Sequence, residues 1–195
     1  MKLKLICLIQ LTSIVFASSG YDIGRSAGKG ILDISLTWNP FNYYEQGQSY
    51  VIMGYGLNKR IDLQAYYSYS HLYSDNYYGG ILYQFYNSNN LYLSTAIGIR
   101  KYIRKKTTHF FAPQLLITKK INDRFTISGS LVSIRDSKNL KNIVGTTKDF
   151  SLAVKVFNSK KYQISISIGS FSPVLWKPDR GNWHPTYSID FKINN

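Results

Sequence analysis

Cysteine is almost absent from this chain of 195 residues. Cys7 is the only one, and it lies in an N-terminal segment that the sequence marks for removal. A mature chain without cysteine forms no disulfide and performs no thiolate chemistry. Such a chain is compatible with an oxidising compartment such as the periplasm.

Acidic residues are also scarce: 10 Asp and Glu stand against 24 Lys and Arg, which gives a formal charge of +14. Without Lys2 and Lys4 the balance is 22 − 10 = +12. A basic balance points to nucleic acid or to an anionic membrane surface. No nucleic-acid-binding motif is present and the chain is expected to be exported, so we expect no nucleic-acid partner.

The N-terminal segment reads as a secretory signal peptide over residues 1–19. Lys2 and Lys4 precede an apolar stretch, Leu5 to Phe16, and Ala17-Ser18-Ser19 supplies small residues for cleavage. The apolar stretch is short for a spanning helix, which needs about 20 residues. No later run approaches that length, so in a bilayer only a closed β-barrel is possible.

Alternation of apolar and polar residues dominates the rest of the chain, and no helical periodicity of useful length interrupts it. It predicts ten strands in a single barrel domain over residues 31–195, although eight strands are possible. Residues 20–30 are Gly-rich and are interpreted as a flexible periplasmic lead-in, because Gly24, Gly28 and Lys29 lack the spacing of a phosphate loop. The predicted strands cover residues 31–38, 49–57, 61–71, 77–86, 91–101, 109–119, 125–134, 148–157, 162–171 and 186–194.

The connections alternate between short and long. The short ones, at residues 58–60, 87–90, 120–124 and 158–161, are rich in Asn, which tolerates left-handed backbone. Short periplasmic turns and longer external loops are typical of bacterial outer-membrane barrels. An even number of strands places both termini on the periplasmic side. Pro113 predicts a bulge or a late strand start, because proline removes a ladder donor.

The polar face of the strands indicates which face meets water. In the strand at 162–170, Ile164, Ile166 and Ile168 stand opposite small residues such as Ser165 and Ser167. A water-exposed face would carry many charges, whereas small residues suit a crowded interior. The apolar face is therefore predicted to meet lipid, and aromatic residues near the strand ends are expected to form interfacial girdles.

With this signal peptide and this strand pattern, the chain resembles the small bacterial outer-membrane β-barrel proteins. The resemblance implies location in the outer membrane, contact with its lipid and lipopolysaccharide, and insertion by the outer-membrane assembly machinery. Barrels of this class usually end in a strand with a terminal aromatic. This chain keeps the alternation but ends at Asn195, with Phe191 four residues earlier.

A lipid-modifying enzyme similar to the lipid A deacylases is the alternative function. Those enzymes pair His with Ser, and the weak catalytic candidates are His71, His109 and His184. Ser70 and His71 are adjacent on a strand and point to opposite faces, so they cannot pair. The three histidines lack metal-ligand spacing, and the sequence indicates neither a metal site nor a cofactor.

Two features predict binding at the outer end. A cluster of cations around "RKYIRKK" suits lipopolysaccharide phosphates, and each tryptophan occurs as Trp-X-Pro, which fits interfacial anchoring or sugar stacking. The residues are Arg100, Lys101, Arg104, Lys105 and Lys106 for the cluster, and Trp38, Trp176 and Trp183 for the tryptophans.

The interior of a ten-stranded barrel is only modestly wider than that of an eight-stranded one, whose side chains fill it. Lumen candidates of both charge signs are expected to bond across it and plug it. They are Asp33, Asp62, Gln64, Gln84, Arg100, Gln114, Lys155, Asp190 and Lys192. The sequence therefore predicts a plugged outer-membrane barrel with a structural or surface-binding role. The alternatives are a lipid-modifying enzyme and a soluble periplasmic β-barrel.

Overall fold

The computed structural model describes residues 23–39, 48–70, 75–102, 109–111, 113–136, 138–173 and 183–194. The predicted signal peptide at residues 1–19 lies outside these ranges. Within them, no helix is long and apolar enough to cross a membrane. The strands are β1 (Leu32–Asn39), β2 (Gln48–Gly56), β3 (Ile61–Ser70), β4 (Asn76–Ser88), β5 (Leu91–Tyr102), β6 (His109–Phe111), β7 (Gln114–Lys120), β8 (Phe125–Asp136), β9 (Ile143–Asn158), β10 (Tyr162–Pro173) and β11 (His184–Ile193).

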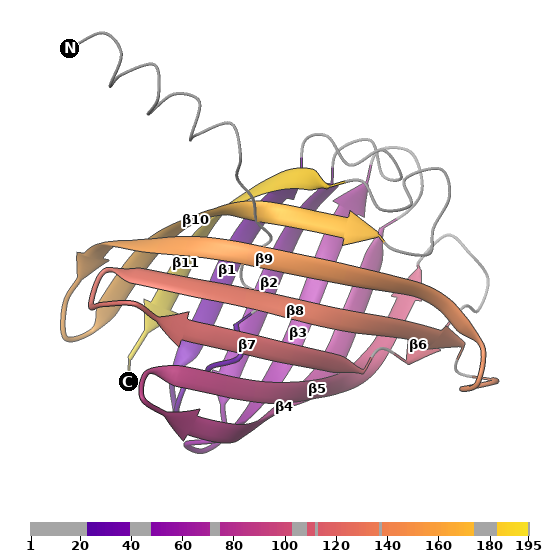
Figure 1. Cartoon of the computed structure of the whole chain (residues 1–195), viewed down its shortest axis with the longest axis horizontal. Helices are drawn as coiled ribbons and strands as arrows, with labels where there is room; N and C mark the ends of the chain where they lie inside the picture. The colour runs from indigo at the N-terminus through magenta and orange to yellow at the C-terminus, as the bar shows by residue number, and fades with distance from the viewer. Residues whose placement is uncertain are drawn as a thin grey trace, which may run out of the picture.

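The strands form one closed antiparallel ring (Figure 1). Apart from β6 and β7, each strand pairs with its neighbours in chain order, and β1 pairs with both β2 and β11, which closes the sheet. β6 and β7 share one position between β5 and β8, so eleven strands fill ten positions. The predicted all-β, up-and-down barrel of ten strands is confirmed.

The break between β6 and β7 falls at Pro113, where the sequence predicts an irregularity. Proline has no N–H to donate to the ladder. Its carbonyl still accepts a hydrogen bond of 2.9 Å from the amide of Ser133 on β8. The strand therefore resumes at Gln114 after the proline instead of running through it.

The short turns at one end owe their geometry to asparagine. Asn58 Oδ1 accepts the amides of Arg60 and Ile61 at 2.8 and 3.0 Å, and Asn122 Oδ1 makes the same pair of bonds to Arg124 and Phe125 at 2.8 and 2.9 Å. Between β4 and β5 the two-residue turn at 89–90 has φ values of +50° and +61°. A type I′ hairpin turn requires left-handed backbone at both positions, and asparagine tolerates it.

The first strand begins and the last strand ends at this same end of the barrel. Leu32 at the start of β1 pairs with Ile193 at the end of β11. The short turns gather on the left in Figure 1, beside the C-terminus, and the β8–β9 hairpin lies on the right. The strand bounds leave more residues between strands at the second end than at the first. The predicted asymmetry between a turn end and a loop end is present.

The apolar side chains of the ring point outward and the small polar ones point inward. On β5, Ile97 and Ile99 are 45% and 56% exposed, whereas Ser94 and Ala96, at alternate positions of the same strand, are 0% and 1% exposed. The same alternation holds on β10, where Ile166 and Ile168 are outward. Other large outward side chains are Leu36, Val51, Met53, Leu63, Tyr67, Ile81, Leu115, Ile117, Leu131, Phe150 and Ile189.

Soluble monomers rarely expose continuous apolar patches above a few hundred square ångströms, whereas outward apolar side chains continue around this ring. A soluble periplasmic barrel would need the opposite orientation of every strand. The fold is therefore that of a membrane barrel, with its polar face turned inward.

Candidate functional site: the barrel lumen

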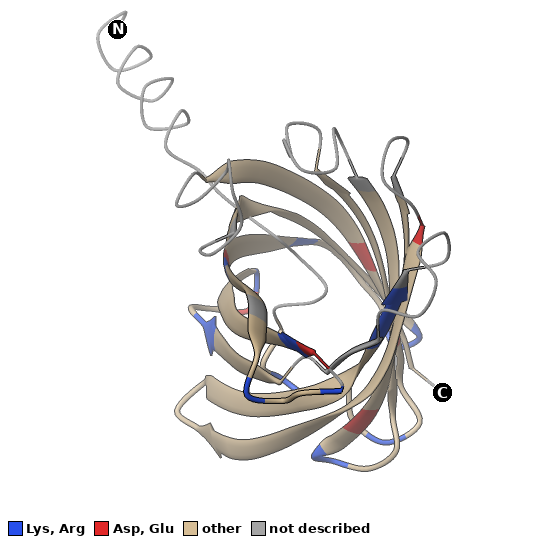
Figure 2. Cartoon of the chain, turned by 90° about the vertical axis from the view of Figure 1, so that its right-hand side faces the viewer, with Lys and Arg blue, Asp and Glu red and all other residues tan. Residues whose placement is uncertain are grey.

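The lumen is lined by hydroxyl and amide side chains, and it is the candidate functional site. Figure 2, which looks along the barrel from the loop end, shows most of the strand wall uncharged. Small polar residues recur at every second position because the alternating pattern places them there. The buried lumen residues include Ser35, Thr37, Ser68, Ser94, Thr118, Ser128, Ser151, Ser165, Ser167, Thr186 and Ser188.

Residues 23–30, which the sequence suggests as a lead-in, lie inside this lumen near the turn end. Asp62 holds them: its carboxylate accepts hydrogen bonds from Ser26 Oγ at 2.6 Å and from the amide of Ala27 at 2.8 Å. The side chain of Gln84 accepts the amide of Ser26 at 2.9 Å. Lys192 Nζ donates to the carbonyl of Ala27 at 2.9 Å. Ser26 and Ala27 are buried as a result.

Gly24 extends this segment along the wall to β5 and β7, which follow β3 and β4 in the ring. Its amide donates to Thr118 Oγ1 at 2.8 Å, and its carbonyl accepts from Ser94 Oγ at 2.5 Å. A β-carbon at Gly24 would stand 2.7 Å from the carbonyl oxygen of Leu116, so only glycine permits this approach. Residues 24–27 therefore bond to five strands, β3, β4, β5, β7 and β11. We call residues 24–27 the lumen segment.

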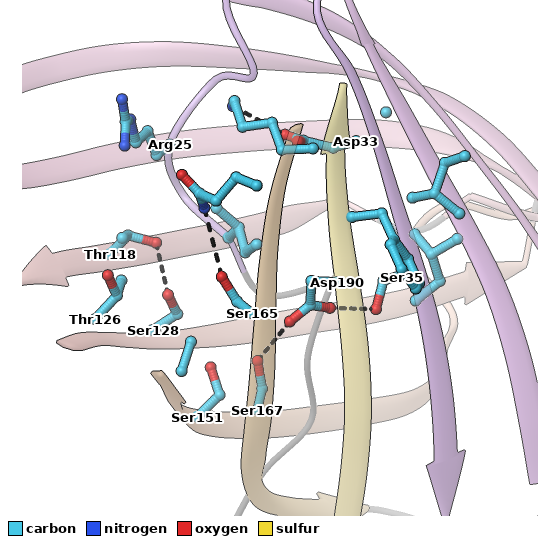
Figure 3. A pocket seen from close by; sticks show the side chains of 18 of the residues that line it. Arg25, Asp33, Ser35, Thr118, Thr126, Ser128, Ser151, Ser165, Ser167 and Asp190 are labelled. Atoms are coloured by element: carbon cyan, nitrogen blue, oxygen red, sulfur yellow. Dashed lines mark hydrogen bonds and ion pairs between the residues drawn. The ribbon is translucent and has the colours of Figure 1, made fainter. Parts of the chain in front are cut away.

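Beside the lumen segment lies a cavity of about 140 Å³ that is lined by Arg25 and by residues of β1–β3 and β7–β11. Asp190 organises its floor by accepting hydrogen bonds from Ser35, Ser167 and Ser188 at 2.6, 2.6 and 2.9 Å. Figure 3 shows Asp190 between Ser35 and Ser167. These bonds join β1, β10 and β11, the strands that close the ring.

A second closure lies nearer the loop end. Ile52, Tyr66 and Tyr78 from β2–β4 pack in one buried cluster with Val132 and Ile134 from β8. β2 and β8 occupy opposite positions in the ring of ten, so this cluster spans the lumen. We call these five side chains the aromatic constriction. The sequence shows the inward parity of Tyr66 and Tyr78, but not that they meet β8.

Arg100 is attached to the aromatic constriction. Tyr66 and Tyr78 stack with ring centroids 5.5 Å apart and planes 7° from parallel, and the guanidinium of Arg100 lies 5.8 Å from the Tyr66 centroid. Arg100 Nε donates to Asn76 Oδ1 at 2.9 Å, and Asn76 Nδ2 donates to Ser68 Oγ at 2.6 Å. The cation is thus part of the lumen, and it is not on the outer surface.

The predicted lipopolysaccharide cluster is therefore divided. Lys101 is the neighbour of Arg100 on β5 and points to the other face, in register with the exposed Tyr77. Arg104, Lys105 and Lys106 lie outside the described residues.

The tryptophan candidates are outward where they are described. Trp38 is 55% exposed and packs on Tyr187 with ring centroids 6.2 Å apart, and Trp183 is 54% exposed. Trp38 lies near the loop end of β1 and Trp183 directly precedes β11 at the same end. Interfacial anchoring predicts tryptophans at this level of the barrel. Trp176 lies outside the described residues.

The histidine candidates do not come together in the described part of the chain. His184 is buried on β11, and its carbonyl accepts a hydrogen bond from Ser170 Oγ at 3.2 Å. It shares its parity with the lumen residues Thr186 and Ser188, so its side chain is on the inner face. His71 lies outside the described residues, and of His109 only the backbone, in β6, is described. In those described ranges, no three His, Cys, Asp or Glu side chains gather as metal ligands.

A closed ring of ten antiparallel strands with an apolar exterior, a polar interior and short turns at one end defines a class. It is the architecture of the small, porin-like bacterial outer-membrane β-barrel proteins.

Solved structures that align with the chain include two porins and a β-barrel domain. The KdgM porin aligns over 85% of this chain and 99% of its own, at 10% identity and a TM-score of 0.46. The NanC porin aligns over 84% and 100%, at 11% identity and 0.46. The N-terminal β-barrel domain of Pseudomonas aeruginosa OprF aligns over 85% and 99%, at 13% identity and 0.37.

No family model and no curated protein matches the chain. At such low identities and TM-scores nothing about activity or ligand follows from the alignments. The assignment to the class rests on the strand ring and its two faces.

Proposed function

We propose that this chain is an outer-membrane barrel with a plugged lumen, and that its role is structural or surface-binding. In this proposal the signal peptide directs export, the assembly machinery inserts the barrel, and the short turns face the periplasm. The barrel is an anchor that presents its outer end, and it is not a diffusion pore.

The single observation that carries the proposal is the double closure of the lumen. At the turn end, the lumen segment is hydrogen-bonded to Asp62, Gln84 and Thr118 on three strands. Nearer the loop end, the aromatic constriction packs from β2–β4 to β8. A continuous water path of the kind that a diffusion pore needs would have to pass both.

Conductance in planar lipid bilayers tests this proposal. The purified mature chain is expected to insert without producing stable open-channel steps. A variant that lacks residues 23–27 and carries Tyr66→Ala and Tyr78→Ala removes both closures, and it is expected to conduct. Steady porin-sized steps from the wild-type chain would overturn the plugged-lumen proposal.

A surface-binding role is favoured by one row of side chains on the outer face. Cross-strand register aligns Leu36, Val51, Tyr67, Tyr77 and Lys101 around the barrel. The first three of these side chains also line a surface groove of about 300 Å³, together with Trp38 and Tyr69. An amphiphile with an acyl chain in the groove and a phosphate near the Lys101 ammonium fits the row, and lipopolysaccharide has this chemistry.

Lipopolysaccharide binding is measured on the detergent-solubilised barrel with purified lipopolysaccharide. Lys101→Gln is expected to weaken binding about fivefold, because a lysine near an anionic lipid surface contributes about 1 kcal/mol. Lys148→Gln, an exposed lysine on β9 away from the row, serves as the matched control and should leave binding unchanged. Equal binding by wild type and Lys101→Gln would remove Lys101 from the site.

The enzymatic alternative is tested separately. His71→Ala, His109→Ala and His184→Ala, each expressed in the source cell, are expected to leave lipid A acylation unchanged. A change in the lipid profile with one of them would favour the lipid-modifying enzyme.

A further inference from the structure

We propose that the cations at the turn end form a binding collar for the phosphate headgroups of anionic phospholipids. The inference rests on the proposed function, in which the turn end is the periplasmic end. The collar, which we call the basic rim, consists of Lys59, Arg60, Lys119, Lys120, Arg124, Lys160 and Lys161.

The basic rim carries almost no compensating negative charge. Among the described residues of the turns and adjoining strand ends, Asp123 is the one acidic side chain outside the lumen. Lys120 Nζ bonds to it at 2.5 Å, and this hydrogen bond and the lysine charge lower the pKa of Asp123. Seven cations and one ionised carboxylate leave a local charge of +6 on this end.

The cations stand directly beside residues of the lipid-facing surface. Leu115, Ile117 and Lys119 are alternate residues of β7 and point outward. Lys119 therefore lies two residues beyond the last apolar side chain of this series. Lys161 Nζ lies 5.5 Å from the ring centroid of the exposed Tyr162. Since two residues of a strand span about 7 Å, these ammonium groups stand at the boundary between acyl chains and headgroups.

The two asparagine turns repeat this arrangement. The first places Arg60 just after the exposed Leu57, and the second places Arg124 immediately before the exposed Phe125, with Ile121 also 53% exposed. An apolar residue at the membrane boundary, followed within three positions by a cation, fixes the depth of the charge. A long cationic side chain can then lie along apolar surface and place its head among the phosphates.

This depth separates a lipid from other anionic partners. A cell-wall polymer or an acidic protein would meet the turns from the water side, and it would gain nothing from the apolar neighbours of each cation. Phosphates of the adjoining leaflet lie at the level of Lys119 and Lys161 without any further approach. Each Lys or Arg near an anionic lipid surface is worth about fivefold in binding.

The test uses the purified mature chain in neutral detergent with added phosphatidylglycerol, and phosphatidylcholine as the uncharged reference. Native mass spectrometry counts the lipids retained and gives their dissociation constants. The wild-type chain is expected to prefer phosphatidylglycerol. The triple variant K59Q/K160Q/K161Q is expected to lose about tenfold or more of this preference.

A matched variant, K138Q/K141Q/K148Q, removes the same charge from exposed lysines on the β8–β9 hairpin at the other end. That hairpin reaches farthest to the right in Figure 1, away from the turns. The matched variant is expected to keep the wild-type preference for phosphatidylglycerol. Equal losses of lipid preference in the two variants, or no preference in the wild type, would overturn the basic rim as a lipid site. Rim-dependent binding to purified cell-wall polymer, without any lipid preference, would also overturn it.

Heat-modifiable gel migration and resistance to alkaline extraction from membranes are recorded for all three proteins. Barrels that insert but show no lipid preference contradict this inference alone. A wild-type chain that fails to insert contradicts the proposed function as well.

Discussion

At the residue scale, the molecule depends on small inward side chains at the points where larger groups approach. The ring of Tyr78 lies over the inward glycines of β4 and β5. A β-carbon on Gly98 would stand 2.5 Å from Cζ of Tyr78, and one on Gly80 would stand 2.3 Å from its hydroxyl oxygen. The aromatic constriction exists because these two positions lack a side chain.

Gly98→Ala is therefore expected to destabilise the barrel by about 1–3 kcal/mol, the usual cost of overpacking a well-filled interior. Gly79→Ala is the matched control, because nothing lies within 4 Å of a β-carbon at that position. Urea unfolding in lipid vesicles measures both. Equal stability of the two variants would contradict the packing of Tyr78 described above.

Asp190→Ala tests the hub that joins the closing strands. It removes the acceptor of three serine hydroxyls, which remain buried without that partner. A hydrogen bond to a charged group contributes about 1.5–3 kcal/mol to stability. The cost of burying the carboxylate offsets part of the contribution of the three serine hydrogen bonds. The expected loss is about 2 kcal/mol, seen as a lower temperature of unfolding in gel-shift assays. Asp123→Ala, at an exposed turn, should leave that temperature nearly unchanged.

At the element scale, the turns set the register of the hairpins, and asparagine sets the turns. The sequence predicts this well, since an Asn-rich connection between two alternating segments is a local signal. Observed strand ends differ from the predicted ones by a few residues at most positions. The exception is β9, which the sequence predicts to begin at residue 148 and which begins at Ile143. Its pairing with β8 extends toward the loop end as far as Arg135 and Ile143.

Asn90→Val tests the two-residue turn. Valine at a φ of +61° is expected to cost about 1–2 kcal/mol, because its β-carbon crowds the following carbonyl in left-handed backbone. Lys59→Val, in a turn residue outside the left-handed region, is the control. The rate of folding into vesicles, measured by gel shift, should fall for Asn90→Val only. An unchanged rate would show that the turn adapts to the substitution.

At the scale of the whole molecule, the two faces of the wall could be predicted from the sequence, and the contents of the lumen only partly. The alternation that places Ile99 outward and Ala96 inward is a property of one strand. By contrast, the bond between Gly24 and Thr118 joins residues 94 positions apart, and it exists only once the ring has closed. The parity of Arg100 likewise predicted an inward side chain, but its place on Tyr66 depends on three neighbouring strands.

Site-specific spin labelling tests the inside-out wall most directly, and the predicted absence of cysteine from the mature chain makes it practical. Single cysteines replace Ile97, Ala96, Ile166 and Ser167 in turn. After reconstitution into vesicles, the labels are exposed to oxygen, which partitions into lipid, and to a water-soluble nickel chelate. The structure predicts high oxygen accessibility at Ile97 and Ile166, and low oxygen accessibility at Ala96 and Ser167. The reverse alternation, or failure of all four labels to respond to oxygen, would contradict the membrane barrel.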